Sequence, residues 1–176
     1  MTGARSSFGE RSAAGTRGVV FIHCCPAALG PHVEWAIAGV LGQPVKLSWT
    51  AQPAAPANLR TDATWIGPVG TAARIAASLR SWPMLVFEVT EEPTATSDGE
   101  RLAFVPGRGF HRSMIAANGD VVVGEERVRA LLNRARTADD FAHGLNDLIG
   151  TAWDTELEPY RHAGDGVAVT LLHKVV

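Results

Sequence analysis

The residues best suited to chemistry lie close together near the N-terminus and are His23, Cys24, Cys25 and His32. A cysteine thiolate can act as a nucleophile when a helix N-terminus lowers its pKa and a histidine serves as the base. Pro31 favours the start of a helix shortly after the two cysteines. The stretch is therefore compatible with a small enzyme whose catalytic residues come from this group, although no known cysteine-enzyme signature surrounds them.

The same side chains are ligand types for zinc, but their spacing does not favour a metal site. A structural zinc site takes four ligands, usually as two close pairs separated by a longer span. The sequence holds one irregular group and no second pair. In an extended strand, His23 and Cys25 would share one face and Cys24 would point to the other. We predict neither a metal nor a cofactor.

The cysteines and the overall charge predict the location of the protein and the kinds of partner it does not bind. Adjacent cysteines form a bridge only with strained geometry, so free thiols and a cytoplasmic location are expected. The chain of 176 residues has a formal net charge of −2, which argues against nucleic-acid binding. No apolar run approaches the roughly 18 residues of a membrane span. A homo-oligomer stays open.

A second group of residues favours binding. The helix expected from Pro31 to Gly42 has its apolar stripe on one side and places His32 and Trp35 on the opposite side. A tryptophan in this position is either covered by the C-terminal half of the chain or exposed as a patch for a partner or ligand. Both alternatives stay open at this point.

The polar segment 151–166 is predicted to be a link without regular structure that Trp153 and Tyr160 anchor over the sheet or the first helix. Together with the helix surface it gives a predicted binding patch. The predicted binding residues are His32, Glu34, Trp35, Trp153, Asp154, Glu158, Arg161 and His162. Because no complete catalytic motif is found, the leading hypothesis is a non-catalytic binding or regulatory module that engages a protein partner or a small ligand. The small enzyme described above is the alternative.

The loop Gly67 to Thr71 lies between a predicted strand and a predicted helix. Free backbone N–H groups at such a helix start can hold an anion. The loop lacks the lysine of a phosphate-binding P-loop, so a simple capped turn is the favoured interpretation.

Residues 19–91 show the element order strand, helix, strand, strand, helix, strand. The expected ranges are 19–22, 31–42, 45–49, 59–66, 71–81 and 84–91. This βαββαβ order is that of a ferredoxin-like unit, in which two helices cover one face of a mostly antiparallel sheet.

The second half is predicted to extend this core with a β-hairpin, two helices and a final strand. The strands are expected at 101–105, 110–116 and 121–123, the helices at 125–136 and 137–150, and the last strand at 167–175. Thr137 and Asp140 form a capping-box pattern at the second helix. The fold class is therefore α+β, with residues 1–17 as a disordered tail and 18–176 as a single domain.

Several long segments together resemble one family. They are RGVVFIHCCPAALGPHVEWAIAGVLG, LSWTAQPAAP, FEVTEEP, SDGER, GTAWDTELEPYRHAGDG and LLHKVV. The chain is similar, over nearly its whole length, to the actinobacterial proteins grouped as domain of unknown function 3145. The resemblance implies a small soluble cytoplasmic protein of actinobacteria and transfers no catalytic residues.

Overall fold

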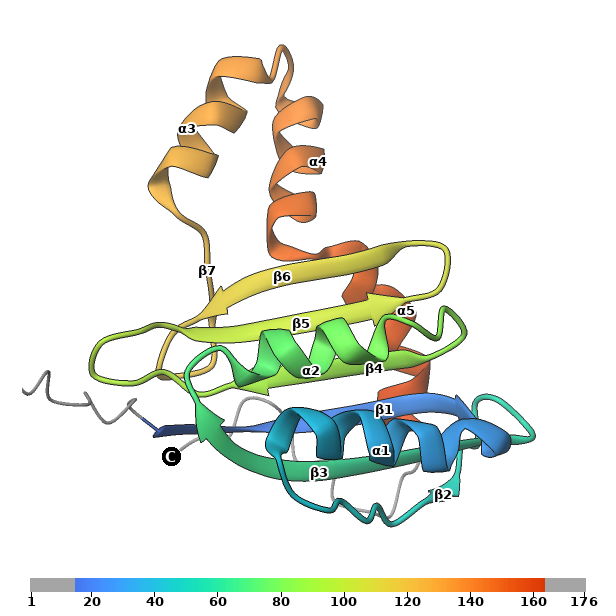
Figure 1. The fold of residues 1–176 in the computed structure, drawn as a ribbon. Coiled ribbons are helices and arrows are strands. Elements are labelled where there is room, and N and C mark those ends of the chain that lie inside the picture. The colour runs from blue at the N-terminus through green and yellow to red at the C-terminus, as the bar shows by residue number, and fades with distance from the viewer. Residues whose placement is uncertain (1–14, 164–176) are drawn as a thin grey trace, which may run out of the picture.

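The computed structural model describes residues 15–163, which form one antiparallel sheet with helices on both faces (Figure 1). The seven strands of this part of the chain follow the order β2-β3-β1-β4-β5-β6-β7. Their bounds are Gly15–Pro26 (β1), Thr50–Ala51 (β2), Asn58–Pro68 (β3), Val86–Glu91 (β4), Gly99–Val105 (β5), Gly109–Ile115 (β6) and Val121–Val122 (β7). The predicted α+β class and the antiparallel sheet are confirmed.

Helices α1 (Gly30–Leu41) and α2 (Thr71–Leu79) cover one face of the sheet, and the short helix η1 (Ala27–Leu29) leads into α1 (Figure 1). Their inward side chains are fully buried. The main core comprises Val33, Ile37, Ile75 and Leu79 from the helices, packed on Val20, Ile22, Phe87, Val89, Leu102 and Phe104. The side chains of β4 alternate, so Phe87 and Val89 join this core while Val86 and Glu88 point to the other face.

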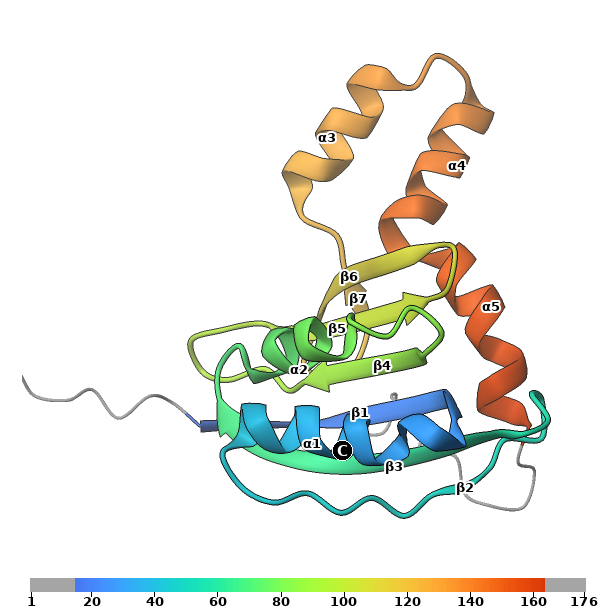
Figure 2. The same cartoon turned by 45° about the vertical axis from the view of Figure 1, so that its right-hand side comes forward.

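Helix α5 (Thr151–His162) packs on the other face of the sheet (Figure 2). Leu157 is fully buried in a second cluster, whose buried members are Cys24, Val86, Ala103, Val105 and Leu157. The prediction of an irregular link at 151–166 is therefore wrong. Trp153, Leu157 and Tyr160 follow each other at spacings of about one helical turn, and Pro159 lies on the exposed side of α5.

Helices α3 (Glu125–Arg134) and α4 (Ala138–Ile149) stand away from the sheet as a hairpin (Figures 1 and 2). The predicted capping box at α4 is confirmed. The Asp140 N–H donates to Thr137 Oγ1 and the Thr137 N–H donates to Asp140 Oδ2, both at 3.1 Å. Gly150, with a φ of 85°, ends α4 and begins α5.

Several predicted element ends differ from the structure by a few residues, and two assignments differ more. Strand β1 begins at Gly15, so residues 15–17, assigned to a tail, belong to the sheet, and residues 1–14 lie outside the described part. Residues 45–49 form no strand. The Leu47 N–H donates to the Glu34 side chain at 3.0 Å instead of to a neighbouring strand. The predicted last strand at 167–175 lies outside the described residues.

Within residues 15–163, no helix combines the length and the apolar character that crossing a bilayer requires.

Candidate functional site

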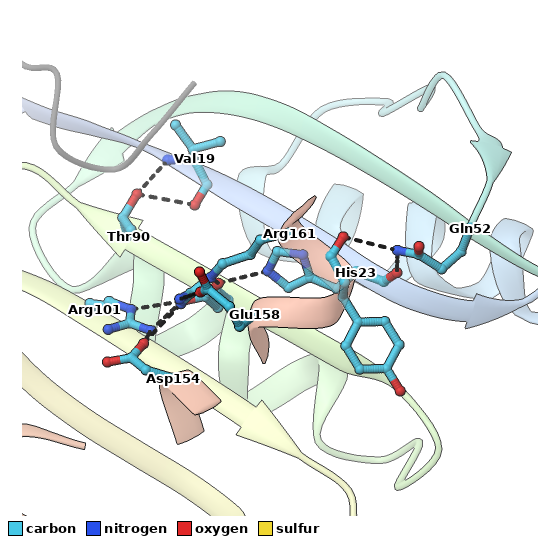
Figure 3. Close-up of polar contacts among 10 residues, drawn as sticks. Val19, His23, Gln52, Thr90, Arg101, Asp154, Glu158 and Arg161 are labelled. Carbon is cyan, nitrogen blue, oxygen red and sulfur yellow. Dashed lines mark hydrogen bonds and ion pairs between the residues drawn. The ribbon is translucent and has the colours of Figure 1, made fainter. Parts of the chain in front are cut away.

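A cluster of charged side chains lies between the sheet and α5 (Figure 3). Its centre is Glu88 of β4, whose side chain is fully buried. The Glu88 cluster consists of His23 from β1, Glu88 from β4, Arg101 from β5, and Asp154 and Arg161 from α5. Each member points into the same space because α5 crosses over these three central strands (Figures 2 and 3).

Hydrogen bonds occupy both oxygens of the Glu88 carboxylate. Arg161 binds it with two parallel bonds, from Nε to Oε2 at 3.0 Å and from Nη2 to Oε1 at 2.6 Å. Arg101 Nε donates to Oε1 at 2.7 Å, and His23 Nε2 lies 2.7 Å from Oε2. Both arginines also contact Asp154 Oδ1, at 2.5 Å and 3.0 Å. The cluster therefore ties three strands to α5.

The charges in this cluster balance. Burial would raise the pKa of Glu88, but the hydrogen bond from His23 and the charge of Arg101 hold the pKa of this carboxyl well below its usual range. Burial likewise opposes the charge of Arg161, yet its bonds to Glu88 and the charge of Asp154 raise the pKa of the guanidinium. Two carboxylates thus face two guanidinium groups, and each guanidinium group is paired with both Glu88 and Asp154.

The outer side of α5 borders an open depression of about 650 Å³. Its lining residues in the described chain are Thr151, Asp154, Thr155, Glu158, Pro159 and His162, which include three predicted binding residues. His162 Nε2 lies 2.6 Å from Glu158 Oε1, so these two groups pair with each other. In the described chain, no three His, Cys, Asp or Glu side chains are placed to hold a metal ion.

The cysteines lie on opposite faces of β1, as neighbouring residues of a strand do, and a β-bulge decides which of them shares a face with His23. The pairing of β1 shifts register after Ile22, and the extra residue turns His23 and Cys24 to the same side. Cys24 packs in the cluster under α5, whereas Cys25 is buried in the core under α1. The prediction that His23 and Cys25 share a face is therefore wrong.

Neither thiol is prepared for nucleophilic attack. Burial raises the pKa of Cys24, and burial together with the neighbouring Cys24 raises the pKa of Cys25 to about 11. His32 is exposed on α1, where its ring centre lies 6.5 Å from that of Trp82. His23 is bonded to Glu88. The four candidate catalytic residues therefore form no common site.

The outer surface of α1 carries the most exposed large apolar side chain of the described residues. Trp35 is 79% exposed, so neither α3, α4 nor α5 covers it. His32 lies one turn before it and is also exposed. Met84, 48% exposed, belongs to the turn that begins at Trp82. We refer to His32, Trp35 and Trp82 as the Trp35 patch.

Glu34 serves the fold of this region. Its carboxylate accepts hydrogen bonds from the Leu47 N–H, Trp49 Nε1 and Lys46 Nζ, at 3.0–3.1 Å. Although burial opposes it, these bonds lower the pKa of Glu34. Glu34 thereby fastens the segment after α1 to the helix and is not free to meet a ligand.

The two halves of the predicted binding patch do not come together. The residues from α1 lie over one face of the sheet, and those from α5 lie over the other (Figures 1 and 2). The Trp35 patch and the Glu88 cluster are thus separate features of the molecule.

Comparison with known proteins agrees with the resemblance of the sequence segments. Residues 19–174 match the family described as Protein of unknown function, DUF3145. The chain belongs to the DUF3145 family. No curated protein and no solved structure matches it.

Sequence reasoning missed two central members of the Glu88 cluster in this DUF3145 chain. Glu88 stands in the middle of β4, all six residues of which are buried, and Arg101 stands in β5. A charged residue inside an apolar strand needs a buried partner of opposite charge. The sequence showed these charged residues inside apolar strands, but their partners of opposite charge lie at distant positions in the chain.

The loop before α2 does hold an anion, and that anion is part of the protein. The N–H groups of Gly70 and Ala72 donate to the two carboxylate oxygens of Glu91, at 2.7 and 2.9 Å. This carboxylate at the N-terminus of α2 satisfies donors that a helix start leaves free. The interpretation as a capped turn therefore fits the DUF3145 chain, with Glu91 supplying the cap.

Proposed function

We propose that this protein is a non-catalytic binding module that docks a protein partner on the Trp35 patch. The observation that carries the proposal is the exposure of Trp35 on a helix whose opposite side is fully packed. A large aromatic side chain in water contributes nothing to the core, whereas tryptophan is among the residues that contribute most to binding interfaces. His32 and Trp82, whose ring centres lie 6.5 Å apart, extend the surface with further aromatic rings.

The charges around the patch indicate the chemistry of the partner. Helices α1 and α2 contain one acidic residue, Glu34, which internal hydrogen bonds already use. Arg74 and Arg80 are exposed on and directly after α2. Two cations on the helix that packs beside α1 favour a partner with opposite charge. The partner we infer is therefore an apolar protein segment flanked by carboxylates.

The state of the candidate catalytic residues supports a binding function over the enzyme alternative. Both thiols are buried with raised pKa values, and His32 lies away from them. In the Glu88 cluster, the arginines are paired with carboxylates and leave no free guanidinium group for a substrate.

Peptides selected from a random display library against the full-length protein test the proposal. We expect selected peptides to pair an apolar residue with acidic ones and to change the tryptophan fluorescence. Trp35→Ala should weaken their binding at least about tenfold, which corresponds to about 1.4 kcal/mol. Ile66→Ala is the matched control, because Ile66 is 78% exposed but projects from β3 on the other face of the sheet.

Equal binding by Trp35→Ala and wild type would contradict the proposal. A loss of the same size for Ile66→Ala would show non-specific adhesion to exposed apolar groups. A selection that returns peptides without acidic residues would contradict the inferred chemistry of the partner while leaving the patch itself in place.

We also propose a specific fold topology and a cellular location. The order β2-β3-β1-β4, with antiparallel pairing and α1 and α2 on one face, supports a ferredoxin-like core. Two free buried cysteines support a reducing, cytoplasmic environment. An actinobacterial source stays a prediction.

A further inference from the structure

A cavity of about 230 Å³, which we call the β3 cavity, lies between α1 and the outer edge of β3. Its walls come from the C-terminal half of α1, from β1 and β3, and from the segment that follows α1. The apolar side chains in these walls are Val20, Ile37, Leu41, Val45, Ala63 and Trp65. Protein interiors rarely leave a space much larger than a water molecule, so the β3 cavity is a candidate ligand site.

The β3 cavity stays open because the segment after α1 does not pair with β3. Strand β2 pairs only with the first part of β3. Residues 43–49 run along the outer side of β3 (Figures 1 and 2), but Glu34 holds this segment to α1 through the Leu47 N–H. On the β3 side, Ala63 contributes only a methyl group. No side chain of the described residues therefore fills the gap.

The indole N–H of Trp65 is a hydrogen-bond donor without an acceptor in the described part of the chain. Trp65 is 3% exposed and forms part of the cavity wall. In Trp49 and Trp153, by contrast, this group donates to an oxygen of the protein. A buried tryptophan N–H usually has a partner, so the β3 cavity has beside it a donor that the described fold does not use.

The volume of the β3 cavity fits a small molecule with one ring. An apolar cavity of about 150 Å³ is large enough for benzene, so about 230 Å³ leaves room for a benzene ring with a short substituent. The hydrocarbon side chains of the walls favour an apolar body, and a few polar groups then fix its orientation. The indole N–H of Trp65 would serve as such a group for a hydrogen-bond acceptor.

The lining of the β3 cavity disfavours a charged ligand. Among the described residues that line it, there is no lysine, arginine, aspartate or glutamate. A carboxylate or a phosphate would lose its hydration there without gaining an opposite charge. The acceptor on the ligand is therefore a neutral group, and a carbonyl oxygen is the simplest acceptor for a single N–H.

We propose that the β3 cavity binds a small neutral molecule that has an apolar body the size of a substituted benzene ring and a carbonyl oxygen. The carbonyl oxygen accepts a hydrogen bond from Trp65 Nε1, and the apolar body packs against α1 and Val45. This site is independent of the docking proposed for the Trp35 patch, because Trp35 lies on the outer side of α1 and Ile37 on the inner side.

Acetophenone and α-methylstyrene are matched probes for this site, because they have the same shape and differ only in carrying C=O or C=CH₂. Each probe is titrated into ¹⁵N-labelled full-length protein while NMR follows the indole N–H signals. The Trp65 signal is the one that is missing from Trp65→Phe. Acetophenone should bind saturably and move this signal to higher frequency, as a new hydrogen bond does, whereas α-methylstyrene should not.

Two variants test the donor and the cavity separately. Trp65→Phe should weaken acetophenone binding at least about tenfold and α-methylstyrene binding much less, because only acetophenone uses the N–H. Ala63→Leu should abolish the binding of both probes, because the larger side chain fills the space. Ala51→Leu is the matched control, since Ala51 is an exposed strand residue outside the cavity. Circular dichroism shows whether each variant keeps its fold.

A lack of saturable acetophenone binding, or equal binding by wild type and a folded Ala63→Leu variant, would overturn the proposal. The same loss of binding in Ala51→Leu as in Ala63→Leu would also overturn it, because the probes would then bind outside the β3 cavity. If Trp65→Phe weakened both probes equally, the assignment of Trp65 Nε1 as the donor would be wrong.

Discussion

The two faces of the sheet differ in whether their polar and aromatic side chains are buried and paired or exposed. Under α5, a fully buried glutamate binds two arginines and a histidine, and each charge meets an opposite charge. Over α1, a tryptophan is 79% exposed, and Glu34 there holds the local backbone. The charged cluster under α5 is therefore internally satisfied, whereas the α1 side leaves a large aromatic side chain exposed, where we propose that a partner docks.

The comparison distinguishes two kinds of unusual residue, one with a structural role and one that is free for recognition. A buried carboxylate among arginines resembles a catalytic arrangement, but saturated hydrogen bonds leave it no role toward a substrate. An exposed tryptophan has no internal role and is available for recognition. The variants below are expected to have large effects on stability at the closed face and small effects at the open one.

The largest effect is expected at Glu88. Glu88→Gln removes the charge that two arginines share, and these arginines would remain in a site with little access to water. Breaking a buried ion pair from one side typically costs about 3–5 kcal/mol. Urea denaturation should show a loss of unfolding free energy in this range.

Glu156→Gln is the control for Glu88. Its carboxylate pairs with Arg108 at the edge of α5, where both side chains are more than one third exposed. Such a pair contributes about 0–1 kcal/mol. Losses of similar size in the two variants would show that the Glu88 cluster does not hold α5 to the sheet.

A smaller loss is expected at Gly150, where α4 passes into α5. The residue has a φ of 85°, and a Cβ there would lie 2.6 Å from the ring of His111. Gly150→Ala should cost about 2–4 kcal/mol, because a strained backbone angle and a collision add together. Gly42→Ala, at a φ of 69° with open space around the Cβ, should cost only about 1 kcal/mol. Equal melting temperatures for the two variants would contradict the close packing of α5 on His111.

A modest effect of pH is expected from His111. This side chain is 8% exposed and lies beside Trp153, with a ring-centre distance of 4.9 Å. Burial, assisted by Arg101 and Arg127 and opposed by Asp154, lowers the pKa of His111 below its ordinary value of 6.5. The unfolded chain then binds more protons than the fold, so stability decreases as the pH falls below about 6.5.

His111→Phe keeps an aromatic ring beside Trp153 and removes the titration. Its stability should depend less on pH than that of wild type between pH 7 and pH 5, as measured by denaturation at each pH. The contribution of Glu88 is lost at lower pH, below its ordinary pKa of 4.5, because its pKa is lowered in the fold. Parallel pH profiles for wild type and His111→Phe would rule out the assigned protonation.

The fold could be predicted where local signals were complete. The apolar spacing in α1 and α2 and the capping box of α4 are patterns within about a dozen residues, and they gave the correct elements. Helix α5 was missed because the polar composition of the segment outweighed a short apolar stripe. Helix propensity does not include the ion pairs of α5 with Arg101 and Glu88, which stabilise this helix only in the folded protein.

The candidate sites were harder to predict, because their residues are far apart in the sequence. Helical spacing alone places His32 and Trp35 on the side of α1 opposite its apolar stripe, so that side could be predicted. Their exposure could not, because cover by the C-terminal half of the chain was an open alternative. The Glu88 cluster joins residues from four elements, and no local pattern connects them. The β-bulge in β1 moves Cys24 to the side of His23, and one inserted residue of this kind reverses the predicted face of every later residue in the strand.

The smallest effect on stability is expected at Trp35. Trp35→Ala removes a side chain that is 79% exposed from a helix interior, where alanine has the highest intrinsic helix propensity. The unfolding free energy should stay within about 0.5 kcal/mol of wild type, although this variant loses the binding surface. A loss above about 1 kcal/mol would mean that Trp35 packs against part of the same chain. The contrast between a closed α5 face and an open α1 face would then fail, because both faces would use their aromatic side chains for internal packing.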